Sequence, residues 1–151
     1  MTVKTYNPEW VNLTIRYEEG GEVENLPADS NDWEQMVSRY VDPRYVHSTS
    51  TSGMVTRTKT VNKLGQFELE VPQGSSLLSF LSDKVGQDGK FTITVAEIQT
   101  SGTLSENVLD AQLSGASITE PGDITRAREA SMRTFIFEGL LKKAEELAYV
   151  E

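Results

Sequence analysis

The stretch MVTRTKTVNKLGQFELEVPQ, residues 54–73, alternates its residue types on both sides of a short Asn-Lys-Leu-Gly segment. Before that segment one side carries Val55, Arg57, Lys59 and Val61, and the other carries Thr56, Thr58 and Thr60. After it, Phe67, Leu69 and Val71 alternate with Gln66, Glu68 and Glu70. A period of two is typical of β-strands. We therefore predict a long polar hairpin over residues 54–71 that turns at 62–65, with Arg57 and Lys59 facing Glu68 and Glu70.

The rest of the chain is predicted to be mostly strand. Alternation bounded by turn residues predicts strands over residues 9–17, 22–26, 90–98, 107–119 and 131–141. Residues 45–61 form either one strand or a strand pair interrupted at Gly53. We predict a single domain over residues 1–151.

Apolar residues at helical spacing predict two short helices. The first covers residues 33–41, with Asp29, Ser30 or Asn31 as its N-cap. The second covers residues 75–85, begins at Ser75 or Ser76, and ends at Gly86. The last residues, 140–151, fit either a final helix or a flexible tail.

The composition excludes several classes of protein. There are 14 Lys and Arg residues against 23 Asp and Glu residues, a net charge of −9, which disfavours a main role in gripping DNA phosphates. The absence of cysteine excludes disulfides and thiolate metal sites. No stretch approaches the roughly 20 apolar residues of a membrane helix, so we expect no membrane partner.

Catalytic motifs are also missing from the sequence. The single histidine, His47, lies among Ser and Thr residues without a nucleophile motif, as expected on a strand surface. Residues 29–34 begin like a calcium loop, but Trp33 and Glu34 occupy positions that need a ligand and a glycine. We expect no enzyme activity, no catalytic or metal-binding residues and no cofactor.

Four features follow one another along the chain: the polar hairpin at 56–71, the leucine-rich helix at 75–85, the strand at 91–95, and Arg128-Glu129 followed by the aromatic strand at 135–137. Taken in this order, they resemble the tail tube proteins of contractile-tailed bacteriophages, a family that includes type VI secretion tube proteins. The resemblance covers roughly residues 45–141. Residues 33–41 and the charged end after Leu141 have no counterpart.

The resemblance implies a mainly β fold, an antiparallel β-sandwich or barrel with a flanking short α-helix and a long polar hairpin. It also implies six-membered rings that stack into a hollow tube in a phage tail, assembled in the host cytoplasm. The implied partners are further copies of the chain, the tail sheath, the baseplate and the tail terminator. Double-stranded DNA would pass through the lumen without specific binding.

The resemblance also suggests roles for particular residues. Strand pairing between subunits would use the hairpin, through Thr56, Thr58, Thr60, Phe67, Leu69 and Val71. The lumen would be lined either by Glu68 and Glu70 or by Arg57 and Lys59. An acidic wall would let DNA slide without sticking.

Two alternatives remain open at this point. A type VI secretion-like tube or a baseplate tube-initiator protein would have the same architecture. A monomeric β-sandwich binding module would instead expose aromatic residues on one face, for which the candidates are Tyr6, Trp10, Tyr40 and Tyr45.

Overall fold

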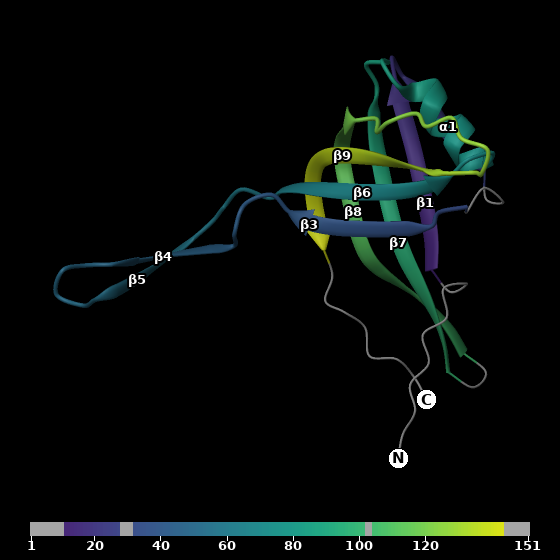
Figure 1. Ribbon diagram of the computed structural model, residues 1–151. Helices are drawn as coiled ribbons and strands as arrows, with labels where there is room; N and C mark the ends of the chain where they lie inside the picture. The colour runs from purple at the N-terminus through teal and green to yellow at the C-terminus, as the bar shows by residue number, and fades with distance from the viewer. Residues whose placement is uncertain (1–10, 28–31, 102–103, 144–151) are drawn as a thin grey trace.

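The computed structural model describes residues 11–27, 32–101 and 104–143, and it describes their side chains except those of residues 97–110 and 143. This part of the chain is mainly β-strand with one short helix (Figure 1). The elements in chain order are β1 (Val11–Glu19), β2 (Glu22–Asn25), β3 (Gln35–Tyr40), β4 (Tyr45–Thr49), β5 (Val55–Lys59), β6 (Leu64–Pro72), α1 (Ser76–Lys84), β7 (Lys90–Ser101), β8 (Leu104–Glu120) and β9 (Met132–Lys143).

Seven strands form one antiparallel sheet in the order β2-β1-β7-β8-β9-β6-β3. The sheet bends where β8 meets β9, at a register shift between Ser114 and Ser117. As a result β3, β6 and β9 cross over β1, β7 and β8, and the two parts form facing layers (Figure 1). Within the described residues β2 and β3 remain separate edges, so the sheet is sandwich-like and is not closed into a barrel.

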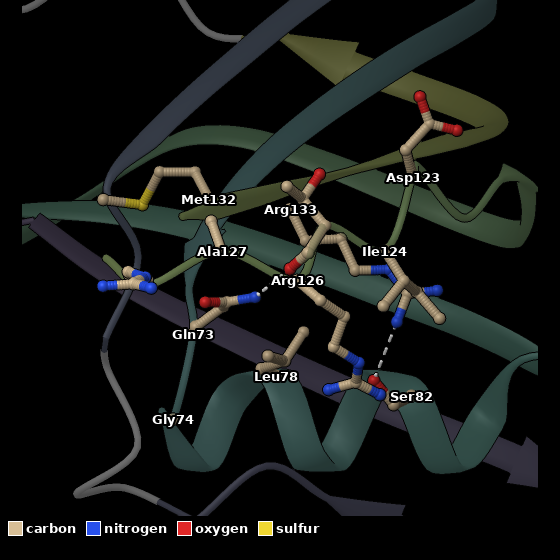
Figure 2. A pocket seen from close by; sticks show the side chains of 12 residues that line it. Gln73, Gly74, Leu78, Ser82, Asp123, Ile124, Arg126, Ala127, Met132 and Arg133 are labelled. Atoms are coloured by element: carbon tan, nitrogen blue, oxygen red, sulfur yellow. Dashed lines mark hydrogen bonds between the residues drawn. The ribbon is translucent and has the colours of Figure 1, made fainter. Parts of the chain in front are cut away.

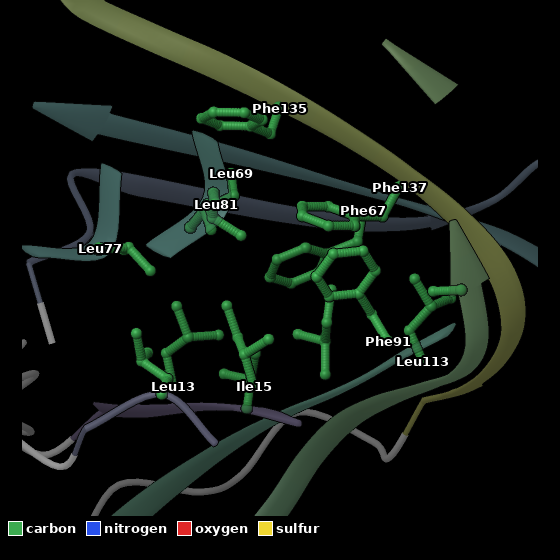
Figure 3. Close-up of a cluster of buried hydrophobic side chains, with 14 of the residues drawn as sticks. Leu13, Ile15, Phe67, Leu69, Leu77, Leu81, Phe91, Leu113, Phe135 and Phe137 are labelled. Carbon is green, nitrogen blue, oxygen red and sulfur yellow. The ribbon is translucent and has the colours of Figure 1, made fainter. Parts of the chain in front are cut away.

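The core fills the space between these layers. Ile15, Leu69, Phe135 and Phe137 are completely buried, and they come from β1, β6 and β9. Phe91 of β7 packs edge-on against Phe137 with ring centroids 5.3 Å apart. Figure 3 shows these side chains meeting from both layers. Alternation on β1, β6 and β9 explains the packing, because every second side chain of a strand points to the same side of the sheet.

The helix α1 closes one end of this core. The Ser75 hydroxyl accepts a hydrogen bond from the Leu78 amide at 3.1 Å, the N-cap interaction that starts the helix. Leu77 and Leu81 lie one turn apart on the buried face and have no exposed surface. The predicted helix over residues 75–85 and its cap are confirmed.

The predicted helix over residues 33–41 is wrong, because residues 35–40 form β3. The residue types of this segment fit both the spacing of a helix and the alternation of a strand. Met36, Ser38 and Tyr40 pair with Leu69, Phe67 and Gly65 of β6 and share their inward side. Pairing with β6 favours the strand, because a helix in this segment would have no element to pack against.

The predicted hairpin between residues 54–61 and 64–71 is also wrong. The strand β5 pairs with β4, with Thr58 opposite Val46, whereas β6 pairs with β3 on one side and with β9 on the other. The chain reverses at Gly53, whose φ of 84° suits glycine. The strand pair interrupted at Gly53, one of the two options for residues 45–61, is therefore confirmed. A long polar hairpin exists, but it runs from β3 to β6 with its tip at residues 50–54.

Gly65 has a packing role rather than a turn role. A Cβ atom built on it would lie 2.1 Å from the Leu141 Cβ atom of β9, so only glycine allows β6 and β9 to approach there. The other predicted strands, at residues 9–17, 22–26, 90–98, 107–119 and 131–141, are confirmed in their described parts. Residues 140–143 belong to β9, and residues 144–151 lie outside the described residues.

Candidate assembly surfaces

The strands β4 and β5 form a ribbon that projects away from the rest of the molecule (Figure 1). We call residues 41–63 the arm. Every side chain of β4 and β5 is exposed, so no part of the ribbon contributes to the core. Its tip is a tight turn in which the Gly53 amide donates to the Ser50 carbonyl at 3.0 Å. An isolated two-stranded ribbon is at best marginally stable in water.

The outer edges of the arm carry unpaired backbone groups. The Thr60 amide donates to the Arg44 carbonyl at 2.7 Å, and the Ser50 amide donates to the Met54 carbonyl at 2.9 Å. Because hydrogen-bonded pairs alternate along an antiparallel ladder, Thr58 also points its backbone toward β4. The backbone groups of Arg57 therefore point outward, where the described residues offer them no strand.

The two faces of the arm differ in chemistry. Residues paired across an antiparallel ladder share a face. One face carries Tyr45, His47, Thr49, Val55, Arg57 and Lys59, with the Arg57 guanidinium 4.5 Å from the Tyr45 ring centre. The other face carries Val46, Ser48, Thr56 and Thr58. The predicted surface position of His47 is confirmed.

The arm is basic whereas the rest of the chain is acidic. Four cations, Arg44, Arg57, Lys59 and Lys63, and a single carboxylate, Asp42, give residues 41–63 a net charge of +3. Since the whole chain carries −9, the remainder carries −12. Opposite charges are thus separated into two parts of one molecule.

A small polar cluster holds the base of the arm. The Arg44 guanidinium lies 4.0 Å from the centre of the Tyr40 ring and donates to the Asn62 carbonyl. The side-chain amide of Asn62 donates to Asp42 Oδ2 at 2.7 Å. Asn62 Oδ1 accepts from the Leu64 amide at 2.8 Å. These contacts tie both strands of the arm to the start of β6.

The predicted hairpin residues fall in two unrelated places. Phe67, Leu69 and Val71 are core residues of β6, whose backbone is paired on both sides. Thr56 and Thr58 lie on the exposed arm, and Thr60 lies at its base. Only the threonines therefore lie where another copy of the chain can reach them.

The predicted lumen residues are likewise separated. Arg57 lies opposite His47, and Lys59 lies opposite Tyr45. The prediction that these two cations face Glu68 and Glu70 is therefore wrong. Glu68 and Glu70 lie on the outer face of the β3-β6-β9 layer, where the sequence analysis missed Glu138, opposite Gln66. Arg39 of β3 bonds to Glu68 at 2.6 Å on the same face. Where β6 pairs with β3 and β9, that face carries one cation and three carboxylates, and Lys142 lies on the same side of β9 beyond the end of β6.

An acidic cluster lies at the turn between β1 and β2. The buried ammonium of Lys84 bonds to Glu24, and this hydrogen bond raises the pKa of Lys84 above its usual 10.5. Burial, followed by the hydrogen bond to Glu19, raises the pKa of Tyr17 above its usual 10.0. The Tyr17 hydroxyl also accepts from the Gly89 amide at 3.0 Å. These groups connect β2 to the end of α1.

A groove runs between α1 and the loop of residues 121–131. Its volume is about 880 Å³, and Figure 2 shows Leu78 and Ser82 of α1 on one side and Ile124 and Arg126 of the loop on the other. Arg128, Met132 and Arg133 also line it. Of this loop, only Arg128-Glu129 entered the sequence-based predictions. Three arginines within eight residues were the signal that it carried.

Two other kinds of feature are absent from the described residues. No group of three or more His, Asp or Glu side chains among them is placed to hold a metal ion. None of the helices in this part of the chain is long and apolar enough to cross a membrane. Of the aromatic residues proposed for a binding module, the two that the structure describes lie on different elements. Tyr40 is half-buried under Arg44, Tyr45 lies on the arm, and Tyr6 and Trp10 lie outside the described residues.

Comparison with known proteins adds little to this description. No protein-family profile matches the chain, and no curated protein matches it. One solved structure that is similar is that of the anti-feeding prophage cap, a tube-terminating cap, at 13% identity and a TM-score of 0.46. The alignment covers 95% of each chain. Similarity at this level is too low to assign the chain to a family.

Proposed function

We propose that this chain is a structural subunit of a phage tail tube, in which copies assemble into six-membered rings that stack around a DNA-conducting lumen. The observation that carries the proposal is the arm. It has no buried residues, and its outer strand edges are unpaired in the described structure. The ordered sequence resemblance over residues 45–141 points to the same role.

An exposed ribbon with open edges gains stability when a neighbouring molecule supplies the missing contacts. Unpaired strand edges are templates for strand addition by another chain. The outward-facing backbone of Arg57 provides one such edge, and the Val46, Ser48, Thr56 and Thr58 face is small and flat enough to lie against another sheet. The arm is thus the part of the subunit that reaches a second copy.

The separation of charge favours contacts between different surfaces of identical copies. An arm of net charge +3 is attracted to a neighbour whose remaining surface carries −12, and two arms repel each other. A contact between unlike patches is heterologous. Such contacts close into rings when the rotation closes and otherwise extend along an axis.

The outer face of the β3-β6-β9 layer is our candidate for the lumen wall. Glu68, Glu70 and Glu138 make it acidic, with Arg39 as its counter-charge. An acidic wall repels DNA phosphates and leaves the duplex mobile, whereas a wall of Arg57 and Lys59 would hold it. We therefore prefer the first of the two lumen alternatives.

The finer features of the proposal come from the family resemblance. They are the ring size, the sheath, baseplate and terminator partners, the DNA cargo and the virion location. A type VI secretion-like tube or a baseplate tube initiator would use the same arm and the same acidic face. Binding of DNA inside assembled tubes after Glu70→Lys with Glu138→Lys, but not before it, would support a lumen lined by that face.

Electron microscopy of the purified chain over a range of concentrations tests the main proposal. We expect rings or tubes of uniform width. The matched variant replaces residues 42–63 with Asn-Gly, which joins Val41 to Leu64 through a two-residue turn. It should melt like the parent chain and form no tubes. Discrete monomers of the parent chain at high concentration would contradict the proposal and favour a binding module.

A further inference from the structure

The groove beside α1 combines cationic and apolar groups. Among the described residues Arg126 and Arg128 have no ion-pair partner, and the Asp123 carboxylate is the only acidic group in the lining. Ile124 is 62% exposed and Met132 is 43% exposed, so apolar surface is open to solvent beside the guanidinium groups. This combination suits a peptide that carries both carboxylates and apolar side chains.

The groove is preformed rather than a gap beside a loose loop. The Gln73 side chain donates to the Thr125 carbonyl at 2.7 Å and accepts from the Ser131 amide at 3.0 Å. Arg133 donates to the Pro121 carbonyl at 2.8 Å and to the Ser82 hydroxyl at 3.2 Å. Both ends of the loop are therefore fixed to β6, β9 and α1. A peptide that binds here does not have to order the loop first.

The chain contains a segment with the matching chemistry. Residues 144–151 read AEELAYVE and carry Glu145, Glu146 and Glu151 with no cation, together with Leu147, Tyr149 and Val150. The segment has a net side-chain charge of −3 against the arginines of the groove. It follows β9, which ends at Lys143.

The geometry of β9 keeps Glu145 and Glu146 away from the groove of their own molecule. Leu140 pairs with Leu64 at one end of β6, whereas Met132, which lines the groove, pairs with Pro72 at the other end. Eight strand steps separate these positions, roughly 27 Å. Glu146 follows Lys143 by three residues and reaches at most about 11 Å beyond it. Its carboxylate therefore meets Arg126 only in another copy.

We propose that the groove between α1 and residues 121–131 binds residues 144–151 of a neighbouring copy. The inference deepens the proposed function and rests on it, because it requires copies to lie head to tail. Arg126 and Arg128 bind Glu145 and Glu146, and the Leu78, Ile124 and Met132 surface receives the apolar side chains that follow. The contact joins opposite ends of two subunits, so it repeats along an axis instead of closing on a pair.

A peptide-binding experiment tests the contact directly. A fluorescently labelled peptide of residues 144–151 is titrated with the full chain carrying Glu145→Lys and Glu146→Lys, which keeps residues 144–151 of other copies out of the groove. Fluorescence anisotropy should show saturable binding that weakens with salt. Adding Arg126→Glu and Arg128→Glu should weaken binding by at least about tenfold. The matched control reverses two exposed cations outside the groove, Arg16→Glu and Lys90→Glu, and should change binding less than about twofold.

Reversing the charges on both sides of the contact tests whether the contact is needed for assembly. The chain with Arg126→Glu and Arg128→Glu should assemble poorly, and adding Glu145→Arg with Glu146→Arg should restore assembly. Equal peptide binding by the groove-reversed chain and its matched control would overturn the inference, even if tubes form. If the peptide binds but no tubes appear at any concentration, the tube proposal fails while the groove contact stands.

Discussion

The arm differs from the rest of the described chain, the seven-stranded sheet with α1 that we call the body, in how it is stabilised. In the body, Phe67, Leu69 and Phe137 are almost or wholly inaccessible to solvent, and β6 is paired on both sides. In the arm every strand residue is exposed and the two strands pair only with each other. The body therefore has its own source of stability, whereas in the proposed assembly the arm gains stability by contact with another molecule. On that proposal, folding and assembly depend on different parts of the chain.

The largest effect should come from the body. Phe137→Ala removes a buried ring that packs against Phe91 at 5.3 Å and Phe67 at 6.4 Å. We expect it to lower the free energy of unfolding by about 3–5 kcal/mol. Chemical denaturation measures this value, with Tyr45→Ala in the arm as the control that should change it by less than about 0.5 kcal/mol. Similar losses from the two substitutions would remove the distinction between arm and body.

The next substitution separates assembly from folding. Thr58→Pro deletes an amide that points toward β4 and should break the arm's ladder. We expect the concentration needed for assembly to rise by at least about tenfold, while the melting temperature of the body stays unchanged. Sedimentation and thermal melting measure the two quantities. Tubes that form at the parent's concentration would mean that the arm does not lie at an interface.

A third substitution tests an ion pair inside the body. Glu24→Gln removes the acceptor that raises the pKa of the buried Lys84, and should cost about 1 kcal/mol because Glu24 is itself half-exposed. A raised pKa stabilises the fold fully below the unfolded value of 10.5, and this contribution is lost as the pH rises through the folded value. The difference from the parent should therefore be present near about pH 8 and shrink near about pH 11. A pH-independent difference would contradict this assignment.

The smallest effect concerns the base of the arm. Arg44→Ala removes the contacts of Arg44 with Tyr40 and with the Asn62 carbonyl. We expect amide exchange at Thr60 to accelerate by about three- to tenfold, which corresponds to roughly 1 kcal/mol of local stability. Global unfolding should not change. Arg57→Ala, at an exposed arginine of the same arm, is the control, and equal acceleration by both would show that the base is not a distinct structural unit.

The sequence predicted best those elements that carry their own structural signal, for a physical reason. Strands such as β1 and β6 have one buried face, so their alternation is visible in the residue types. The helix α1 carries its own cap, Ser75. In these elements local pattern and tertiary environment agree.

Elements whose structure depends on a distant part of the same chain were predicted wrongly. Residues 35–40 fit both helix and strand, and only β6, about thirty residues later in the chain, decides between them. Gly65 looked like a turn residue, but it is required by contact with Leu141 in β9. The turn lies at Gly53 instead. The placement of Glu70 and Glu138 on one face, or of Arg126 beside the groove at α1, likewise depends on the fold and cannot be read from spacing.

The position of the arm within the sheet has a mechanical consequence. The arm leaves the end of β3 and returns directly into β6, and β6 is held by nine residue pairs to β9. A pull along the arm therefore loads that ladder in shear, with its hydrogen bonds strained together instead of being opened one after another. In the proposed assembly, such a geometry would transmit tension from one molecule to the next without unzipping either.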